Sequence, residues 1–229
     1  LGNHVTRLNH PALNGNRSAN IFITANYNPS ERGFVYNNHP VGAYYYAGHW
    51  HIFNQDHATM PMDAAFNVFV PNHSFVHVAS ADSRSGHITY LGTSLPADAE
   101  RRVFVSQNWS EHGIYNPNAI GVYFARSEWG IFNQDSTRPM PNQAAFNVAS
   151  YLPGALGVIQ HSTNASNSSD NFTVLDHPWL NNNPHALIQI TQHWMSVYHN
   201  KEVGVYYTGE RWAIFNQDRS AMPADIVFN

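Results

Sequence analysis

The heptapeptide Trp50-His-Ile-Phe-Asn-Gln-Asp56 occurs three times in this chain of 229 residues. The second copy spans Trp129–Asp135 and the third spans Trp212–Asp218, and only the residue after the tryptophan differs between them. The copies begin 79 and 83 residues apart. Because six positions are identical at near-constant spacing, the chain is an internal repeat, and any fold prediction has to accommodate three related units.

Matching residues extend on both sides of each heptapeptide. A Gly-x-Tyr segment precedes it, and a Met-Pro pair followed five residues later by Phe-Asn comes after it. Further upstream, the aromatic residues Tyr27, Trp109 and Trp194 correspond to one another. The resulting units are repeat 1 (residues 1–82), repeat 2 (residues 83–165) and repeat 3 (residues 166–229).

The repeated unit has the sequence pattern of β-structure. The segment Val203–Phe215 reads as two alternating strands joined by a Thr-Gly-Glu-Arg turn, which predicts a β-hairpin. Phe66–Val70 and Phe75–Ala79 predict a second hairpin, and no window carries a sustained apolar stripe at helical spacing. We therefore predict an all-β protein of three tandem homologous units of about 80 residues. Each unit is expected to form a small sandwich-like or barrel-like sheet, in a pseudo-threefold or a linear arrangement.

Repeat 3 is shorter than the other two at its C-terminal side. Repeats 1 and 2 continue beyond Phe-Asn into further predicted strands, near Phe75–Ala79 and Leu156–Gln160, whereas the sequence stops at Asn229. The corresponding strand of repeat 3 is then replaced by the N-terminal segment, left absent, or supplied by another molecule.

The composition excludes several classes of protein. Only 11% of the residues are charged, against about 25% in an average soluble domain, and Lys201 is the sole lysine. With a formal charge of −4, the chain has no basic patch for nucleic acid. There is no cysteine and no apolar run long enough for membrane insertion. The chain starts at Leu1 without a methionine or a signal segment, which we interpret as a processed N-terminus, and we expect a secreted, extracellular protein.

The polar end of the heptapeptide has two interpretations. In the first, its Asn, Gln and Asp residues lock turns through hydrogen bonds to nearby backbone groups. In the second, they are oriented donors and acceptors in a ligand site that is used three times. The residues concerned are Asn54, Gln55, Asp56, Asn133, Gln134, Asp135, Asn216, Gln217 and Asp218.

The repeated aromatic residues would complete such a site. Sugars stack their C–H faces on flat rings, while their hydroxyl groups need fixed hydrogen-bond partners. One candidate set of rings is Tyr27, Trp109 and Trp194, which lie at the ends of predicted strands, where exposed rings are expected. The other set is Trp50, Trp129 and Trp212, which lie inside the predicted hairpins, where packing in the core is favoured.

The sequence contains no motif of a known catalytic or cofactor site. Gly-x-Ser-x-Gly, His-Glu-x-x-His, phosphate-loop and dinucleotide-binding patterns are all missing, so we expect neither enzyme activity nor a cofactor. His49 and His51 would place two imidazoles on one strand face, but the other repeats lack this pair. Calcium ligation by the three repeated Asp residues lacks the ligand-dense loop of known calcium sites, and no metal site is expected.

The string Trp-x-Ile-Phe-Asn-Gln-Asp with Met-Pro and Ala-Ala-Phe-Asn-Val resembles a repeat found in secreted bacterial proteins of no assigned function. Repeat 3 departs from it, with Asp225-Ile-Val-Phe-Asn in place of Ala-Ala-Phe-Asn-Val. The threefold, asparagine-rich and aromatic-rich design is also similar in style to small multivalent lectins. We therefore expect a non-enzymatic, multivalent carbohydrate-binding protein with glycan partners and up to three equivalent sites. The alternative is a structural subunit of an extracellular filament or surface layer that self-associates by strand addition.

Overall fold

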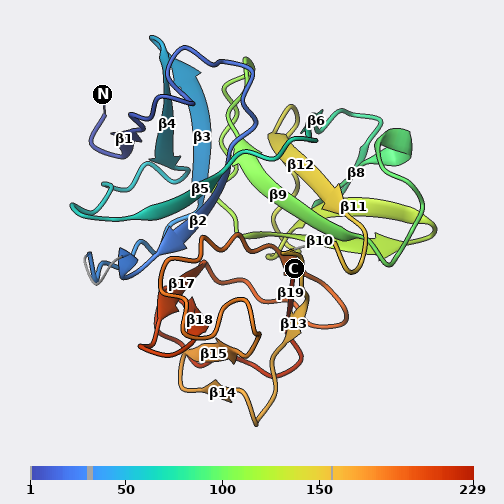
Figure 1. The fold of residues 1–229 in the computed structure, drawn as a ribbon. Coiled ribbons are helices and arrows are strands. Elements are labelled where there is room, and N and C mark those ends of the chain that lie inside the picture. Colours follow the sequence, from blue (N-terminus) through green and yellow to red (C-terminus); the bar gives the residue numbers. More distant parts are fainter. Residues whose placement is uncertain (1, 30–32, 156) are drawn as a thin grey trace.

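The computed structural model describes residues 2–29, 33–155 and 157–229 of the chain. Their regular structure is β-strand, with a 3₁₀ turn at Gly92–Ser94, so the protein is all-β as predicted. The strands make three sheets (Figure 1). Each sheet takes the number of the repeat whose heptapeptide hairpin it contains.

Each sheet contains a hairpin of two strands of five or six residues and has shorter strands at its edges. Sheet 1 has the order β1 (Val5–Arg7), β4 (His49–Asn54), β3 (Val41–Tyr46), β9 (Arg102–Asn108), β12 (Ala145–Tyr151), β6 (Phe75–Val78). Sheet 2 has the order β13 (His161–Ser162), β19 (Val227–Phe228), β16 (Gln192–His193), β10 (Ile120–Ala125), β11 (Glu128–Asn133), β8 (Ile88–Tyr90), β7 (Arg84–Ser85). Sheet 3 has the order β14 (Ser168–Ser169), β15 (Phe172–Leu175), β18 (Trp212–Asn216), β17 (Val203–Tyr207), β2 (Phe22–Asn26), β5 (Phe66–Phe69).

The repeats exchange strands in a closed ring. The hairpin β3–β4 of repeat 1 pairs in parallel with β9 of repeat 2, and the hairpin β10–β11 of repeat 2 pairs with β16 of repeat 3. The hairpin β17–β18 of repeat 3 then pairs with β2 of repeat 1, which returns the chain to its beginning. This cyclic exchange selects the pseudo-threefold arrangement over the linear one. Figure 1 shows the result as three lobes around a common centre.

A glycine in each hairpin is required by close packing. Gly42 lies opposite Phe53, and a Cβ at this position would come within 2.5 Å of Gln55 Nε2 and 2.9 Å of the Phe53 ring. The equivalent glycines, Gly121 and Gly204, have the same two neighbours at 2.7–2.9 Å. The glycine of the repeated Gly-x-Tyr segment is therefore explained by the close contact between the strand backbone and the Phe and Gln side chains of the heptapeptide.

Every unit has its own hydrophobic core, and the heptapeptide tryptophan lies in it. Trp50, Trp129 and Trp212 are at most 4% exposed. Each indole N–H donates to a backbone carbonyl at 2.8–3.1 Å, which satisfies the polar atom of an otherwise apolar ring. These three rings are core residues, as the hairpin position favoured, and they present no face to a ligand.

The predicted second hairpin is wrong. β5 and β6 follow one another in sequence but lie in different sheets, because the chain crosses from sheet 3 to sheet 1 at Pro71–Ser74. In repeat 2 the corresponding strand is β13, a few residues later than the predicted Leu156–Gln160, of which Leu156 lies outside the described residues. No described residue pairs with the outer edge of β5, and the N-terminal strand β1 pairs with β4 instead.

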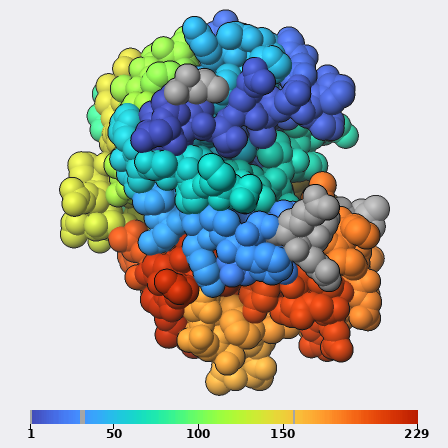
Figure 2. Space-filling model, turned by 90° about the vertical axis from the view of Figure 1, so that its left-hand side faces the viewer, coloured from blue at the N-terminus to red at the C-terminus, as the bar shows by residue number. Residues whose placement is uncertain are grey.

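The surface of repeat 1 is shown in Figure 2, where the teal atoms around β5 form a band below the dark-blue N-terminal residues. Among the described residues, no helix has the length and apolar character needed to cross a membrane.

Candidate functional site

The Asn and Gln residues of the heptapeptide point into the protein. All six are at most 4% exposed. Asn54 Nδ2 donates to the carbonyl of Ala58 at 3.1 Å, and Asn133 and Asn216 make the same kind of bond to the turn that follows them. These contacts favour the turn-locking interpretation over direct contact with a ligand.

The Gln residues also join each repeat to the next. Gln55 Nε2 donates to Gln107 Oε1 at 3.2 Å, and Gln55 Oε1 accepts the backbone N–H of Asn116 at 3.1 Å. One amide of repeat 1 is thereby satisfied by two groups of repeat 2. The equivalent contacts at the other two junctions are those of Gln134 with Gln192 and with the N–H of His199, and that of Gln217 with the N–H of Asn37.

The Asp residues of the heptapeptide lie nearer the surface than the amides. Asp56 Oδ1 accepts the backbone N–H of Ala58 at 3.0 Å, and Asp135 and Asp218 hold the same turn in their repeats. The second carboxylate oxygen faces a different basic side chain in each repeat. The partners are His39 at 2.6 Å from Asp56, Arg138 at 3.8 Å from Asp135, and Lys201 at 2.5 Å from Asp218.

Tyr27, Trp109 and Trp194 lie at the three junctions between repeats, where each is half-buried. Trp109 of repeat 2 packs against Tyr44 and Phe53 of repeat 1, with ring centroids 5.4 and 6.1 Å apart, and against Tyr115 at 5.6 Å. We call each such group a junction cluster. The members of the other two are Tyr27, Tyr36, Tyr206 and Phe215, and Trp194, Tyr198, Tyr123 and Phe132.

The polar residues beside the junction clusters are not repeated. His57 packs on Tyr115 with a centroid distance of 4.1 Å, and Arg219 lies 5.3 Å from the centre of the Tyr36 ring. His87 Nε2 is 3.0 Å from the hydroxyl oxygen of Tyr198, whose side chain is 45% exposed. The three clusters therefore share their rings and differ in their polar surroundings.

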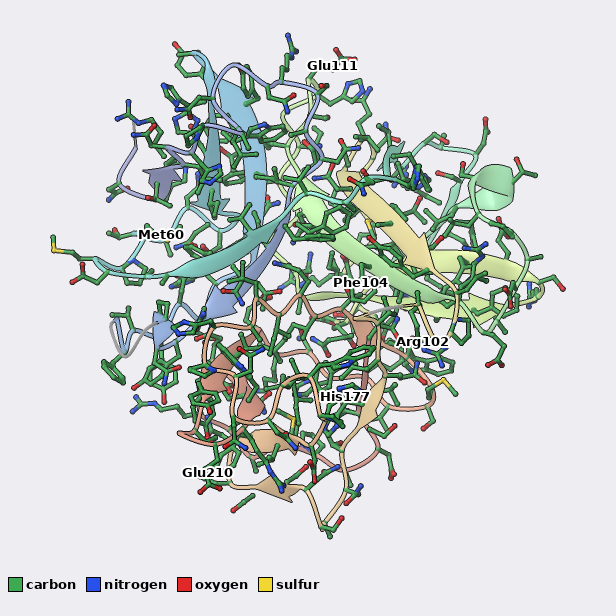
Figure 3. All side chains as sticks on the ribbon, viewed as in Figure 1. Met60, Arg102, Phe104, Glu111, His177 and Glu210 are labelled. Carbon is green, nitrogen blue, oxygen red and sulfur yellow. The ribbon has the colours of Figure 1, made fainter. Side chains whose placement is uncertain are left out.

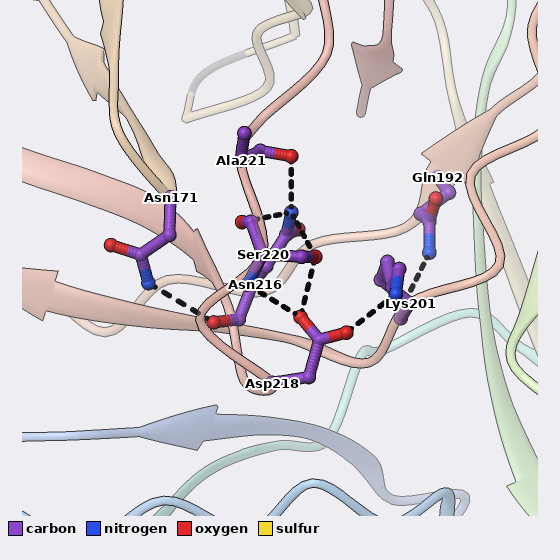
Figure 4. Close-up of polar contacts among 7 residues, drawn as sticks. All are labelled: Asn171, Gln192, Lys201, Asn216, Asp218, Ser220 and Ala221. Carbon is purple, nitrogen blue, oxygen red and sulfur yellow. Dashed lines mark hydrogen bonds and ion pairs between the residues drawn. The ribbon is translucent and has the colours of Figure 1, made fainter.

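A polar hollow of about 380 Å³ opens near the central axis, and residues of all three repeats line it. Asp218 and Lys201 form an ion pair on its wall (Figure 4). Partial burial raises the pKa of the Asp218 carboxyl, but hydrogen bonds from Lys201 and Ser220 outweigh this effect and lower it to about 2. Asp218 is thus a fixed carboxylate at ordinary pH, and the Lys201 side chain is held beside it.

Glu202 lies where this hollow meets a smaller inner cavity of about 90 Å³. Its Oε1 atom is buried and has no hydrogen-bond partner among the described residues. Burial, together with the nearby Asp56 carboxylate, raises the pKa of Glu202 to about 7. The sequence gives no signal for this residue, because Pro40 and Ala119 stand at the same place in the other repeats.

A second hollow of about 380 Å³ is mainly apolar, and residues of all three repeats line it. Phe104 and His177, both labelled in Figure 3, line it together with Trp179. Trp179 is 47% exposed and makes an edge contact with His177 at 4.8 Å. This ring is not repeated, since Ala12 takes its place in repeat 1. Within the described ranges, no group of three His, Asp or Glu side chains is arranged to hold a metal ion.

A protein-family comparison matches the chain three times, at residues 1–70, 46–150 and 129–229, to a domain of unknown function named DUF7452. The chain belongs to this family. The three matches support a DUF7452 protein built from repeats, in agreement with the self-similarity of the sequence and with the three sheets. No curated protein and no solved structure matches the chain.

Proposed function

We propose that this DUF7452 protein is a non-enzymatic, multivalent carbohydrate-binding protein with up to three sites, one beside each junction cluster. The observation that carries the proposal is the threefold recurrence of a partly exposed aromatic cluster at the boundary between repeats. Linked sites of this kind raise avidity without new contacts, which suits an extracellular glycan ligand.

The chemistry at each cluster suits a sugar. The rings offer apolar faces for the C–H surface of a pyranose, and His57, His87 and Arg219 supply polar groups at the edges of the three clusters. Tyr27, Trp109 and Trp194 are the ring candidates in this proposal. The buried tryptophans and the buried Asn and Gln residues take no part in it beyond holding the clusters in place.

A glycan array probed with the intact protein tests the proposal, because binding to no class of sugar would overturn it. For any sugar that binds, Tyr198→Ala is expected to weaken binding, since Tyr198 is the most accessible ring of its cluster. Tyr46→Ala is the matched control, because Tyr46 is 64% exposed and lies outside the three clusters. Equal affinity of the two variants would exclude the junction cluster as the site.

A second candidate function is that of a structural subunit that assembles by strand addition. The observation that favours it is the outer edge of β5, which no described residue covers. Size-exclusion chromatography with light scattering tests this candidate, and a concentration-independent monomer would count against self-assembly.

A further inference from the structure

Within the described residues, two of the three sheets end in a strand that has no counterpart in the third sheet. In sheet 1, β6 pairs antiparallel with β12, and in sheet 2, β13 pairs antiparallel with β19. The strands β12, β19 and β5 are equivalent, because each contains the phenylalanine of the repeated Phe-Asn pair. In sheet 3, β5 is the last strand of the described chain. The strands β6 and β13 are therefore two examples, within this protein, of a strand at the position that is open beside β5.

The backbone contacts of the covered positions are repeated closely. Ala79, just after β6, donates to the carbonyl of Ala144 at 2.8 Å and accepts the N–H of Gln143 at 2.7 Å. Thr163, just after β13, makes the same pair of bonds with Ile226 and Asp225, each at 2.9 Å. The equivalent groups in repeat 1 are the carbonyl of Ala64 and the N–H of Asp63, and neither makes a backbone hydrogen bond with another described residue.

A histidine side chain fixes each covering strand to the neighbouring sheet. His77 Nε2 lies 2.8 Å from Thr89 Oγ1, and His161 Nε2 lies 2.7 Å from Thr173 Oγ1. Thr89 is paired with Ile131 in the heptapeptide strand, and Thr173 is paired with Ile214. Thr6 occupies the same place on β1, opposite Ile52, and no histidine of the described chain reaches it.

The open position also leaves apolar residues of repeat 1 uncovered. Phe66 is partly exposed, whereas its equivalents Phe146 and Phe228 are at most 1% exposed. Met60, labelled beside β5 in Figure 3, is partly exposed, whereas Met140 is completely buried. In Figure 2 this region lies on the molecular surface as the teal band.

The direction of the backbone groups defines the pairing register. Asn26 N donates to the carbonyl of Ala65, so in the antiparallel ladder the N–H and C=O groups of Ala64, Phe66 and Val68 point away from β2. By analogy with His77 opposite Phe146 and Phe75 opposite Val148, a histidine would face Phe66 and an apolar residue would face Val68.

We propose that the edge of β5, with Asp63 and Ala64, accepts an extended peptide strand supplied from outside residues 1–229. The strand runs antiparallel to β5 and has the pattern apolar-x-His-x-small, where the apolar residue is aromatic or β-branched, and its histidine hydrogen-bonds to Thr6. The pattern is that of Phe75–Ala79 and Ile159–Thr163, the chain's own covering segments, which are already paired in sheets 1 and 2. This proposal deepens the strand-addition candidate and is independent of sugar binding.

The probe for the test is a synthetic peptide with the sequence of residues 73–80, His-Ser-Phe-Val-His-Val-Ala-Ser. Isothermal titration against the intact protein is expected to show one peptide bound per chain. Replacing the histidine that corresponds to His77 with alanine should weaken binding about fivefold, the effect of one lost hydrogen bond. Hydrogen exchange of the Phe66 and Val68 amides should slow when the peptide is present.

Three protein variants locate the site. Thr6→Val should weaken peptide binding about fivefold, while Thr173→Val, whose hydroxyl already has a partner, should leave it unchanged. Val68→Pro removes an N–H that faces away from β2 and should abolish binding without unfolding the sheet, as checked by circular dichroism. The proposal is overturned if the peptide does not bind at millimolar concentration or binds Val68→Pro equally well. It is also overturned if the edge of β5 pairs only with that of a second copy, as a dimer that the peptide does not dissociate. If sugar binding on the glycan array persists in any of these outcomes, the strand-addition proposal has failed while the carbohydrate-binding proposal still stands.

Discussion

The backbone N–H of Asn116 in repeat 2 donates to the side-chain Oε1 of Gln55 in repeat 1 at 3.1 Å. The same bond joins His199 to Gln134 and Asn37 to Gln217, so this hydrogen bond is repeated at each junction of the ring. Because each Gln is buried, removing its side chain takes the hydrogen-bond acceptor away from an N–H group in the protein interior. The heptapeptide thus specifies the assembly of the repeats as well as the fold of each one.

The first prediction concerns this junction bond. Gln55→Ala leaves the N–H of Asn116 and the Oε1 of Gln107 without their partner, and we expect a loss of about 2–3 kcal/mol in the free energy of unfolding. Urea denaturation followed by tryptophan fluorescence measures the change. The control is Asn38→Ala, at an exposed asparagine, which should alter stability by less than about 0.5 kcal/mol. Equal stability of the two variants would contradict the role of the junction bond.

The second prediction concerns the glycine that faces the Phe-Gln pair. Gly121→Ala would place a Cβ 2.7 Å from both Gln134 Nε2 and the Phe132 ring, and this overpacking should destabilise the protein by about 2–3 kcal/mol. Gly86→Ala serves as a comparison, because its φ of +57° is strained for alanine but no atom lies within 4 Å of the new Cβ. We expect a loss of about 1 kcal/mol there, so thermal unfolding should rank the two variants clearly.

The repeat, the β class and the core tryptophans could be predicted from the sequence, because each depends on local periodicity and residue type. The exchange of strands between repeats could not. The parallel pairing of Gly42 with Gln107 joins residues far apart in the chain, and no local pattern encodes which repeat a strand will join. For the same reason β5 and β6 were predicted as a hairpin, although the turn residues between them connect two different sheets.

The candidate site could likewise be predicted only in part from the sequence. The correspondence of Tyr27, Trp109 and Trp194 is visible in the sequence, and their position at strand ends agrees with their partial exposure. Two of the three rings that surround each of them come from the neighbouring repeat, so the complete junction clusters form only once the ring is closed. Glu202 is not repeated and has no sequence signal, since its altered pKa arises from burial near the axis.

The third prediction concerns stability in acid. Burial lowers the pKa of His199 to about 4, below the value near 6.5 that is expected in the unfolded chain. Protonation therefore favours unfolding, and stability should fall as the pH decreases from 6.5 to 4. Asn occupies this position in the other two repeats, where its Nδ2 donates to the heptapeptide Asn. The free energy of unfolding of His199→Asn minus that of the parent should therefore be about 2–3 kcal/mol larger at pH 4 than at pH 7. Parallel pH profiles of the two proteins would contradict this assignment.

The fourth prediction concerns Glu202, whose titration should change the stability with pH in the direction opposite to that of His199. Its pKa is about 7 in the folded protein, whereas an unfolded glutamate titrates near 4.5. The unfolded state therefore loses its proton first, and Glu202 should destabilise the protein progressively as the pH rises from 4.5 to 7. Glu202→Gln keeps the size of the side chain and removes the charge, so it should stabilise the protein by up to about 3 kcal/mol at pH 8 and by little at pH 4.

Urea denaturation of the parent and Glu202→Gln proteins at a series of pH values measures the difference directly. Glu210→Gln is the matched control, because Glu210 is exposed and should give a difference that does not change with pH. A flat difference for Glu202→Gln would mean that its carboxyl is ionised in the folded protein without penalty. A stability advantage of Glu202→Gln over the parent that grows between pH 4.5 and 7 would instead identify Glu202 as a proton-binding group at the centre of the ring, where all three repeats meet.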